Sequence, residues 1–237
     1  MNKFGFVVLA MALVTAPVSA LAAYEGGDVK DGGTISGLVK FKGTAPAAKK
    51  LDVGKDKEVC NKAPKLDQSL VVKDGNLANA VVTITDIKKG KKIELKKVKF
   101  DQNGCEYKPH VLAFPAGTTI EILNPDGILH NIHSYSKVNS PFNQAQPKFK
   151  KSLDVKIEKP EAVEVKCDVH GWMHGWLVAT ENPYFAVTDG SGSFKLTDVP
   201  AGSYTVEVWH EKLGKSTQKV TVKAKEEAKV NFEMAAK

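Results

Sequence analysis

The sequence contains no arginine. All 34 basic side chains are lysines, set against 27 acidic residues, and the formal net charge is +7. Without arginine the chain lacks the planar guanidinium that makes bidentate contacts to guanine and phosphate. Aromatic residues make up only 8% of the chain and are scattered, so stacking platforms for bases are also missing. We therefore expect no nucleic-acid partner.

Several other patterns are missing. There is no C-x-x-C-H motif for haem attachment, no glycine-rich phosphate loop and no H-E-x-x-H zinc motif. No long stretch keeps the helical period of 3.6 residues. After residue 22 no apolar run approaches the length of a membrane span. These absences exclude the corresponding haem, nucleotide and protease classes and predict no membrane span in the mature chain.

Residues 1–22 have the pattern of a secretory signal peptide. One lysine precedes an apolar run from Phe4 to Val14, and Ala20-Leu21-Ala22 forms a cleavage box. The apolar run is too short to span a bilayer; a membrane anchor or a buried helix is the alternative. The prediction places the mature protein in a bacterial periplasm, where disulfides persist. Loss of Lys3 leaves 33 lysines against 27 acidic residues, a charge of +6.

The rest of the chain has the pattern of short strands separated by turns. The predicted strands alternate apolar with polar residues and are rich in β-branched side chains. They cover residues 35–41, 81–84, 118–123, 164–166, 193–196, 204–209 and 219–222. The lysine-rich segment from Lys88 to Lys99 is expected to form solvated strand faces and loops. Close turn spacing favours an all-β fold built of sandwiches or barrels.

The C-terminal part resembles the carboxypeptidase regulatory-like domain, a small prealbumin-like β-sandwich. Thr188–Phe194 fits T-D-x-x-G-x-F, and Pro200–Val206 fits P-x-G-x-Y-x-V. Gly33–Phe41 and Ala80–Ile84 resemble the first strands of that family. The resemblance implies a structural or binding module and no catalysis.

This pattern divides the chain into two interleaved parts. Residues 33–100 and 182–237 are predicted to form the small sandwich, and residues 101–181 are predicted to be inserted in it. Five of the six histidines lie between residues 110 and 174. The insert is therefore where metal chemistry is expected.

The segment Cys167–His174 reads C-D-V-H-G-W-M-H. A thiolate, imidazoles and a thioether form a soft donor set that suits copper in both oxidation states. Cys167, His170 and Met173 are spaced so that a tight loop can converge them on one ion. A histidine from a neighbouring strand or loop is expected to complete the set, with methionine as a weak axial ligand.

At this point the sequence resembles the cupredoxins, the family of plastocyanin and amicyanin. C-x-x-H-x-x-M is similar to the amicyanin ligand loop, and His130–His133 (H-N-I-H) is similar to the segment that carries the upstream ligand. A P-x-G-x-x-I strand beginning at Pro115, followed by Asn124, precedes it as in the family. The resemblance implies a Greek-key β-sandwich holding one copper ion with the ligands His130, Cys167, His170 and Met173.

Two other interpretations of this segment stay open. A closed zinc site can use Cys167, His170 and two upstream histidines, although methionine is a poor zinc ligand. The cluster can also be structural and hold no metal. The softness and spacing of the four side chains favour copper.

The remaining histidines are less specific. Residues three positions apart on a strand lie on opposite faces, so His133 points away from His130 and is expected to support the site or lie at the surface. His174 is expected at the edge of the site or in solvent. His110 is expected to make a structural hydrogen bond, with a second metal site as the alternative. His210 is expected at the surface of the small sandwich.

Three cysteines are an odd number. If Cys167 binds copper, Cys60 and Cys105 remain and can pair in an oxidising compartment. That disulfide closes a loop of 45 residues. The competing interpretation is that one of the two is a metal ligand.

The expected function is a periplasmic single-electron carrier that is not an enzyme. Its solvent-facing edge from His170 to His174, with Trp172, is expected to dock a redox partner. That partner is expected to be a cytochrome or a dehydrogenase with an acidic docking surface. The alternative is a copper chaperone, store or resistance factor that binds Cu(I). A copper enzyme needs an open coordination position, which four protein ligands do not leave.

Overall fold

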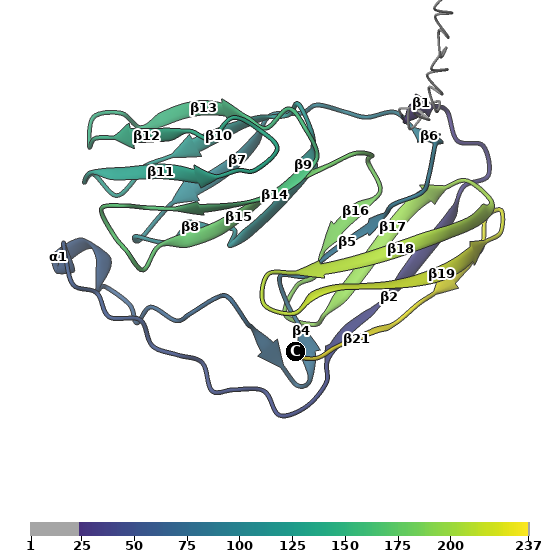
Figure 1. The fold of residues 1–237 in the computed structure, drawn as a ribbon, viewed down its shortest axis with the longest axis horizontal. Coiled ribbons are helices and arrows are strands. Elements are labelled where there is room, and N and C mark those ends of the chain that lie inside the picture. The colour runs from purple at the N-terminus through teal and green to yellow at the C-terminus, as the bar shows by residue number, and fades with distance from the viewer. Residues whose placement is uncertain (1–23, 237) are drawn as a thin grey trace, which may run out of the picture.

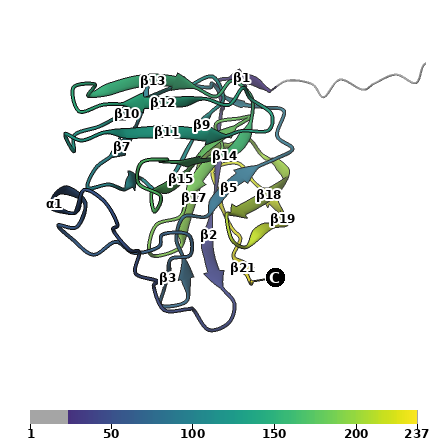
Figure 2. The same ribbon diagram turned by 60° about the vertical axis from the view of Figure 1, so that its left-hand side comes forward.

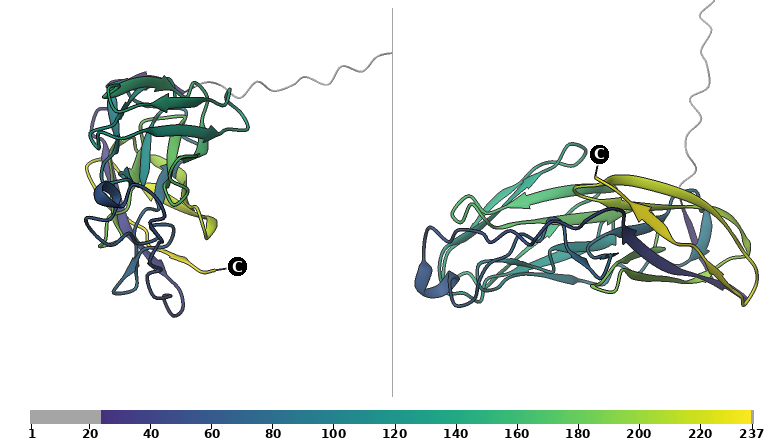
Figure 3. Two further views of the ribbon diagram at one scale, coloured as in Figure 1. Left: turned by 90° about the vertical axis from the view of Figure 1, so that its left-hand side faces the viewer. Right: turned by 90° about the horizontal axis from the view of Figure 1, so that it is seen from below.

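The computed structural model describes residues 24–236, and the predicted signal peptide lies outside the described residues. This part of the chain forms two β-sandwiches that lie side by side (Figure 1). Seen from below, they make the two halves of an elongated molecule (Figure 3). The prediction of an all-β fold with two sandwiches is confirmed. Within residues 24–236, no helix has the length and hydropathy that crossing a membrane requires.

The first sandwich consists of a four-stranded and a five-stranded sheet. The four-stranded sheet has the order β13 (Ser152–Lys156), β10 (Thr119–Leu123), β7 (Val98–Gln102), β8 (Tyr107–Lys108). The five-stranded sheet has the order β12 (Asn143–Gln146), β11 (His130–Tyr135), β14 (Glu161–Lys166), β15 (His174–Thr180), β9 (Val111–Pro115). The β7–β10 and β9–β15 pairs are parallel, and the other pairs are antiparallel.

The second sandwich also has two sheets. One has the order β16 (Phe185–Val187), β5 (Val81–Ile84), β18 (Gly202–His210), β19 (Gly214–Val222). The other has the order β17 (Ser193–Val199), β2 (Gly33–Phe41), β4 (Asn76–Leu77), β3 (Val72–Lys73), and β20 (Glu227–Lys229) and β21 (Phe232–Met234) also pair with β2. A separate parallel pair joins β1 (Glu25–Gly27) to β6 (Lys89–Lys91).

Alternating side chains build a separate core inside each sandwich. In β18 the buried positions alternate at Val206, Val208 and His210, as expected for a strand with one face in a core. The buried apolar residues of the second core fall within residues 35–87 and 184–234, and those of the first within residues 53–179. The core of the first sandwich thus starts before residue 101, because Val53, Cys60 and Phe100 pack in it. The division of domains at residues 100 and 101 stays a prediction.

A third, smaller apolar cluster joins the two sandwiches. Val81 of the second sandwich packs with Val111 and Val178 of the first. Beside them Trp176 and Trp209 make an edge-to-face contact with ring centroids 5.0 Å apart. This contact fixes the end of the β18–β19 hairpin against β9 and β15.

A long segment of the second sandwich reaches across to the first. The chain leaves β2, passes α1 (Lys57–Cys60) at the far end of the first sandwich and returns to β3 (Figures 1 and 2). Lys65 in this segment pairs with Glu106 of the first sandwich at 3.5 Å, and only 5% of the lysine side chain is exposed. The reach of this segment places α1 beside the region where metal chemistry is expected.

One carboxylate holds the turn between β11 and β12. Glu161 accepts hydrogen bonds from the Ser136 hydroxyl, from the backbone N–H groups of residues 137–139 and from the Asn139 amide. Burial raises the pKa of Glu161, but these hydrogen bonds outweigh burial and lower the pKa to about 2. The ionised form therefore stabilises the folded state.

We predict that Glu161→Gln lowers the free energy of unfolding at pH 7 by about 1–2 kcal/mol, because the N–H donors lose a charged acceptor that solvent partly screens. The folded pKa lies below the ordinary value of 4.5, so the difference between wild type and variant shrinks as pH falls from 4.5 towards 2. Urea denaturation at several pH values measures it. Glu164→Gln, which only breaks the exposed pair with Lys166, is the control, and stability curves that stay parallel down to pH 2 would contradict the prediction.

Candidate metal centre

Three buried side chains meet at the end of the first sandwich. His130 is the first residue of β11, and Cys167 and His170 lie on the loop that follows β14. Antiparallel pairing of His133 with Lys166 brings the start of β11 beside that loop. The exposed fractions of His130, Cys167 and His170 are 0%, 2% and 0%. We call these three residues the Cys–His cluster.

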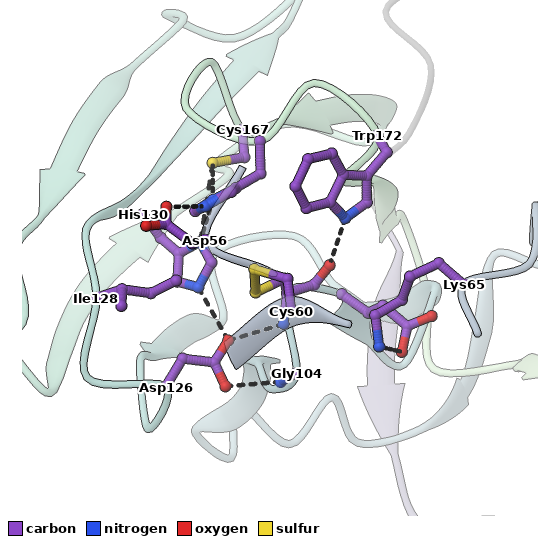
Figure 4. Close-up of a disulfide and its surroundings, with 12 residues drawn as sticks. Asp56, Cys60, Lys65, Gly104, Asp126, Ile128, His130, Cys167 and Trp172 are labelled. Carbon is purple, nitrogen blue, oxygen red and sulfur yellow. Dashed lines mark hydrogen bonds and ion pairs between the residues drawn. A yellow bond between two sulfur atoms is a disulfide. The ribbon is translucent and has the colours of Figure 1, made fainter. Parts of the chain in front are cut away.

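Their donor atoms point at one another. The Cys167 Sγ atom lies 3.9 Å from the Nδ1 atom of His130 (Figure 4). It lies 3.7 Å from the Nδ1 atom of His170, and the two Nδ1 atoms are 2.9 Å apart. Metal–nitrogen bonds of about 2.0–2.1 Å let both nitrogens reach one ion between them. The arrangement therefore has the size of a mononuclear metal site.

The opposite nitrogen of each imidazole faces a carboxylate. His130 Nε2 lies 2.9 Å from Asp126 Oδ2, and His170 Nε2 lies 2.9 Å from Asp56 Oδ2. An ionised carboxylate only accepts, so in each neutral imidazole the Nε2 atom carries the hydrogen and Nδ1 holds a lone pair. Two lone pairs 2.9 Å apart repel unless a proton or a metal ion lies between them. The hydrogen bonding itself therefore calls for a positive charge at the centre of the Cys–His cluster.

A proton on an imidazole Nδ1 atom also supplies this positive charge and can bond to the Cys167 sulfur, and the pKa values of Cys167 and His130 reflect it. Burial alone raises the pKa of Cys167, but hydrogen bonds with His130 and His170 and with nearby backbone groups outweigh it and lower the pKa to about 6. Burial lowers the pKa of His130, but hydrogen bonds to Asp126 and Cys167 outweigh it and raise the pKa above its usual value. At neutral pH the sulfur is thus available as a thiolate, the form that binds metals.

Met173 closes the loop that follows β14. Its backbone N–H donates to the His170 carbonyl, and its carbonyl accepts from the Cys167 N–H. Its side chain is buried in the same apolar core as Cys167. Asn131 ties the loop to β11, because its side-chain oxygen accepts the Asp168 N–H at 2.7 Å.

The structure places the remaining predicted residues outside the cluster. His133 lies on the opposite face of β11 with 32% of its side chain exposed, and it contacts Asp168. His110 and His174 come together elsewhere, beside Glu211. The expectation that His210 lies at the surface was wrong. His210 is fully buried, because the alternation of side chains in β18 points it into the core.

Of two other expectations, one is wrong and one is confirmed. The loop edge at His170 was expected to face solvent, but Asp56 and α1 cover it, so the imidazole is fully buried. The predicted disulfide between Cys60 and Cys105 is confirmed. Because both sulfurs are used in that bond, neither is a free thiolate ligand.

The disulfide also positions the carboxylates. Asp126 accepts the backbone N–H groups of Gly104 and Cys105 at 2.7 and 2.8 Å. Burial raises the pKa of Asp126, but these contacts and His130 lower it overall. On the other half of the bridge, Cys60 ends α1, whose backbone N–H groups bond to the Asp56 carbonyl.

The sequence analysis did not predict the roles of Asp56 and Asp126. Asp56 lies 114 residues from His170, so no local motif links them. Asp126 lies four residues before His130, but that spacing indicates contact only on a helix, and this segment is a loop. Trp172, flagged within the motif, donates its indole N–H to the Cys105 carbonyl at 3.1 Å and packs on His170.

One family model matches part of the chain, and several solved structures are similar to it. Residues 177–235 match the carboxypeptidase regulatory-like domain, which confirms the resemblance seen in the C-terminal sequence. Similar solved structures include a copper-containing nitrite reductase from Thermus scotoductus (22% identity, 42% of this chain, 25% of that chain, TM-score 0.35). Others are a purple cupredoxin from Nitrosopumilus maritimus (21%, 35% and 99%, TM-score 0.31) and amicyanin from Paracoccus versutus (17%, 42% and 97%, TM-score 0.32). The match thus spans a quarter of the nitrite reductase chain, and no curated protein sequence matched.

We predict that replacing both Cys60 and Cys105 by serine lowers the free energy of unfolding by about 3–4 kcal/mol, because the 45-residue loop is no longer closed in the unfolded chain. Urea denaturation of the metal-free protein measures the loss. In the unreduced, unfolded wild type, alkylation followed by mass spectrometry is expected to modify Cys167 alone. Three alkylated cysteines would show that the bridge does not form in the protein.

Proposed function

We propose that the chain is an exported copper protein that carries single electrons in the periplasm and is not itself an enzyme. One copper ion would be held by His130, Cys167 and His170, with Met173 as a weak fourth ligand. When bound, copper supplies one-electron chemistry by cycling between Cu(I) and Cu(II). The observation that carries the proposal is the convergence of two imidazole lone pairs and a thiolate in a buried site.

The donor set favours copper over zinc. Two imidazoles and a thiolate with a long axial thioether are the donors of electron-transfer copper sites. Structural zinc sites are closed by four cysteine or histidine ligands, and among residues 24–236 only three such side chains converge here that are not already bonded in the Cys60–Cys105 disulfide. His133, which the zinc interpretation needs, points to Asp168 instead.

The chain keeps the ligands fixed. Asp56 and Asp126 orient the two imidazoles, and the hydrogen bonds between Cys167 and Met173 close the loop. A site that moves little between oxidation states exchanges electrons with little reorganisation. Full burial of His170 supports electron exchange over transfer of the ion itself, since a chaperone must expose a ligand to pass copper on.

The surface over the site suits an acidic redox partner, such as a cytochrome or a dehydrogenase. The segment that covers His170 carries three exposed lysines, Lys55, Lys57 and Lys62, against two exposed acidic residues, Asp52 and Glu58. Positive charge there would attract an acidic docking surface, and raised ionic strength would slow the encounter.

The decisive experiment is the absorption spectrum of the Cu(II)-loaded mature protein beside its Cys167→Ser variant. We expect an intense visible thiolate-to-Cu(II) band that disappears reversibly on reduction and is absent from the variant. A colourless protein that binds only Cu(I) and releases it to an acceptor would support the copper-trafficking alternative. A visible band that survives the substitution would refute the assignment of Cys167.

The role of the buried carboxylates gives a separate prediction. Asp56→Ala removes the acceptor of the His170 Nε2 hydrogen, and loss of such an outer partner weakens metal binding by about 10–100-fold. Competition with a chromophoric Cu(I) chelator measures the affinity. Asp52→Ala, an exposed aspartate in the same segment, is the matched control and should bind copper as the wild type does. Equal affinity in the two variants would remove Asp56 from the site.

A further inference from the structure

A second group of metal-binding side chains lies apart from the Cys–His cluster. One donor atom from each of His110, His174 and Glu211 lies within 4.8 Å of the other two. His110 Nε2 contacts Glu211 Oε1, and His174 Nε2 lies 3.9 Å from Glu211 Oε2. One carboxylate therefore presents an oxygen to each of two imidazoles. We call these three residues the His–Glu cluster.

The strand arrangement brings the two histidines together. His110 directly precedes β9, and His174 begins β15. The two strands are parallel, and the Trp176 N–H donates to the His110 carbonyl at 2.8 Å. Gly175 permits this approach, because a Cβ atom there would lie 2.9 Å from the same carbonyl oxygen. The imidazoles consequently pack edge to face with centroids 5.0 Å apart.

Glu211 comes from the other sandwich. It lies in the turn between β18 and β19, and the neighbouring Trp209 anchors that hairpin on Trp176. The cluster is thus assembled by the packing of one sandwich on the other. A sequence motif could not reveal it, since Glu211 is 101 residues from His110.

The burial of Glu211 is a second observation that favours a bound cation. Its side chain is only 5% exposed, and His110 is equally buried. Among residues 24–236 the basic groups within 4 Å of its carboxylate are these two imidazoles, although the chain holds 34 lysines. A carboxylate removed from water is costly unless a positive charge joins it. A bound cation meets that need and uses all three donors.

The geometry leaves room for such an ion and for one more ligand. Donors around a tetrahedral ion lie about 3.3 Å apart when the bonds are about 2.0–2.1 Å, and His174 has a 23% exposed side chain that can close the gap of 3.9 Å. A cavity of about 180 Å³ opens beside the two histidines. Trp172 and Met173 of the ligand loop line the same cavity.

We propose that His110, His174 and Glu211 bind a divalent transition-metal ion of the Zn²⁺ or Cu²⁺ class. Two imidazoles and one carboxylate are borderline donors suited to these ions. Three protein ligands leave a fourth position for water or a small molecule from the cavity. The ion would also join the two sandwiches, because its ligands come from both. This proposal does not depend on copper in the Cys–His cluster.

Zinc titration of the copper-loaded mature protein tests the proposal. Native mass spectrometry and elemental analysis count both metals, and thermal unfolding records stability. We expect one equivalent of Zn²⁺ beyond the copper, and a higher melting temperature because only the folded protein holds both halves of the site. Glu211→Gln and, separately, His174→Asn should weaken that equivalent by at least about 10-fold.

Matched variants distinguish zinc held by the His–Glu cluster from zinc bound at the surface. Glu207→Gln alters a carboxylate on β18 that pairs with Lys215 outside the cluster, and it should keep the zinc equivalent. His174 is partly exposed, so its variant tests the site if Glu211→Gln fails to fold. Zinc binding that is absent from the wild type, or unchanged in both cluster variants, overturns the proposal in favour of a metal-free His–Glu contact or surface binding. Zinc that depends on Glu211 is counted whether or not copper loads, so this proposal and the copper assignment can fail separately.

Discussion

The arrangement of the Cys–His cluster depends on two hydrogen bonds that point away from it. Asp126 and Asp56 each fix the Nε2 hydrogen of an imidazole, and this choice turns both Nδ1 lone pairs towards the same point as the Cys167 sulfur. Buried groups of like polarity repel when they face one another, so the arrangement is stable only with a positive charge between them. The carboxylates therefore orient both imidazoles towards a shared cation.

The disulfide links that preparation to the rest of the fold. Cys105 donates its N–H to Asp126, and Cys60 ends the short helix whose first turn is held by the Asp56 carbonyl. An isolated four-residue helix is not stable in water. The bridge and the Lys65–Glu106 pair hold the helix on the first sandwich. Both orienting carboxylates thus depend on one covalent bond between segments that are distant in sequence.

The sequence predicted the parts of this protein that are encoded locally. Alternation with a period of two residues predicted strands such as β2 and β18. The motif C-x-x-H-x-x-M predicted Cys167 and His170 as site residues, because candidate ligands on one loop are close together in sequence. Contacts between segments far apart in sequence could not be predicted in this way. Asp56 reaches His170 from 114 residues away, and Glu211 meets His110 only because the sandwiches pack together. The burial of His170 was missed for the same reason, since its cover comes from a segment expected to belong wholly to the other sandwich.

That cover changes the route by which electrons would pass in the proposed function. With the His170 edge closed by Asp56 and α1, Trp172 packs on His170 and bonds to Cys105, and both Trp172 and Met173 line the cavity beside His174. Electron exchange falls steeply with distance, so this cavity would bring a partner closer to the Cys–His cluster than the covered edge. His110 and His174 of the His–Glu cluster line the same cavity. A metal ion in the His–Glu cluster would add positive charge beside the cavity and would favour an acidic partner surface there.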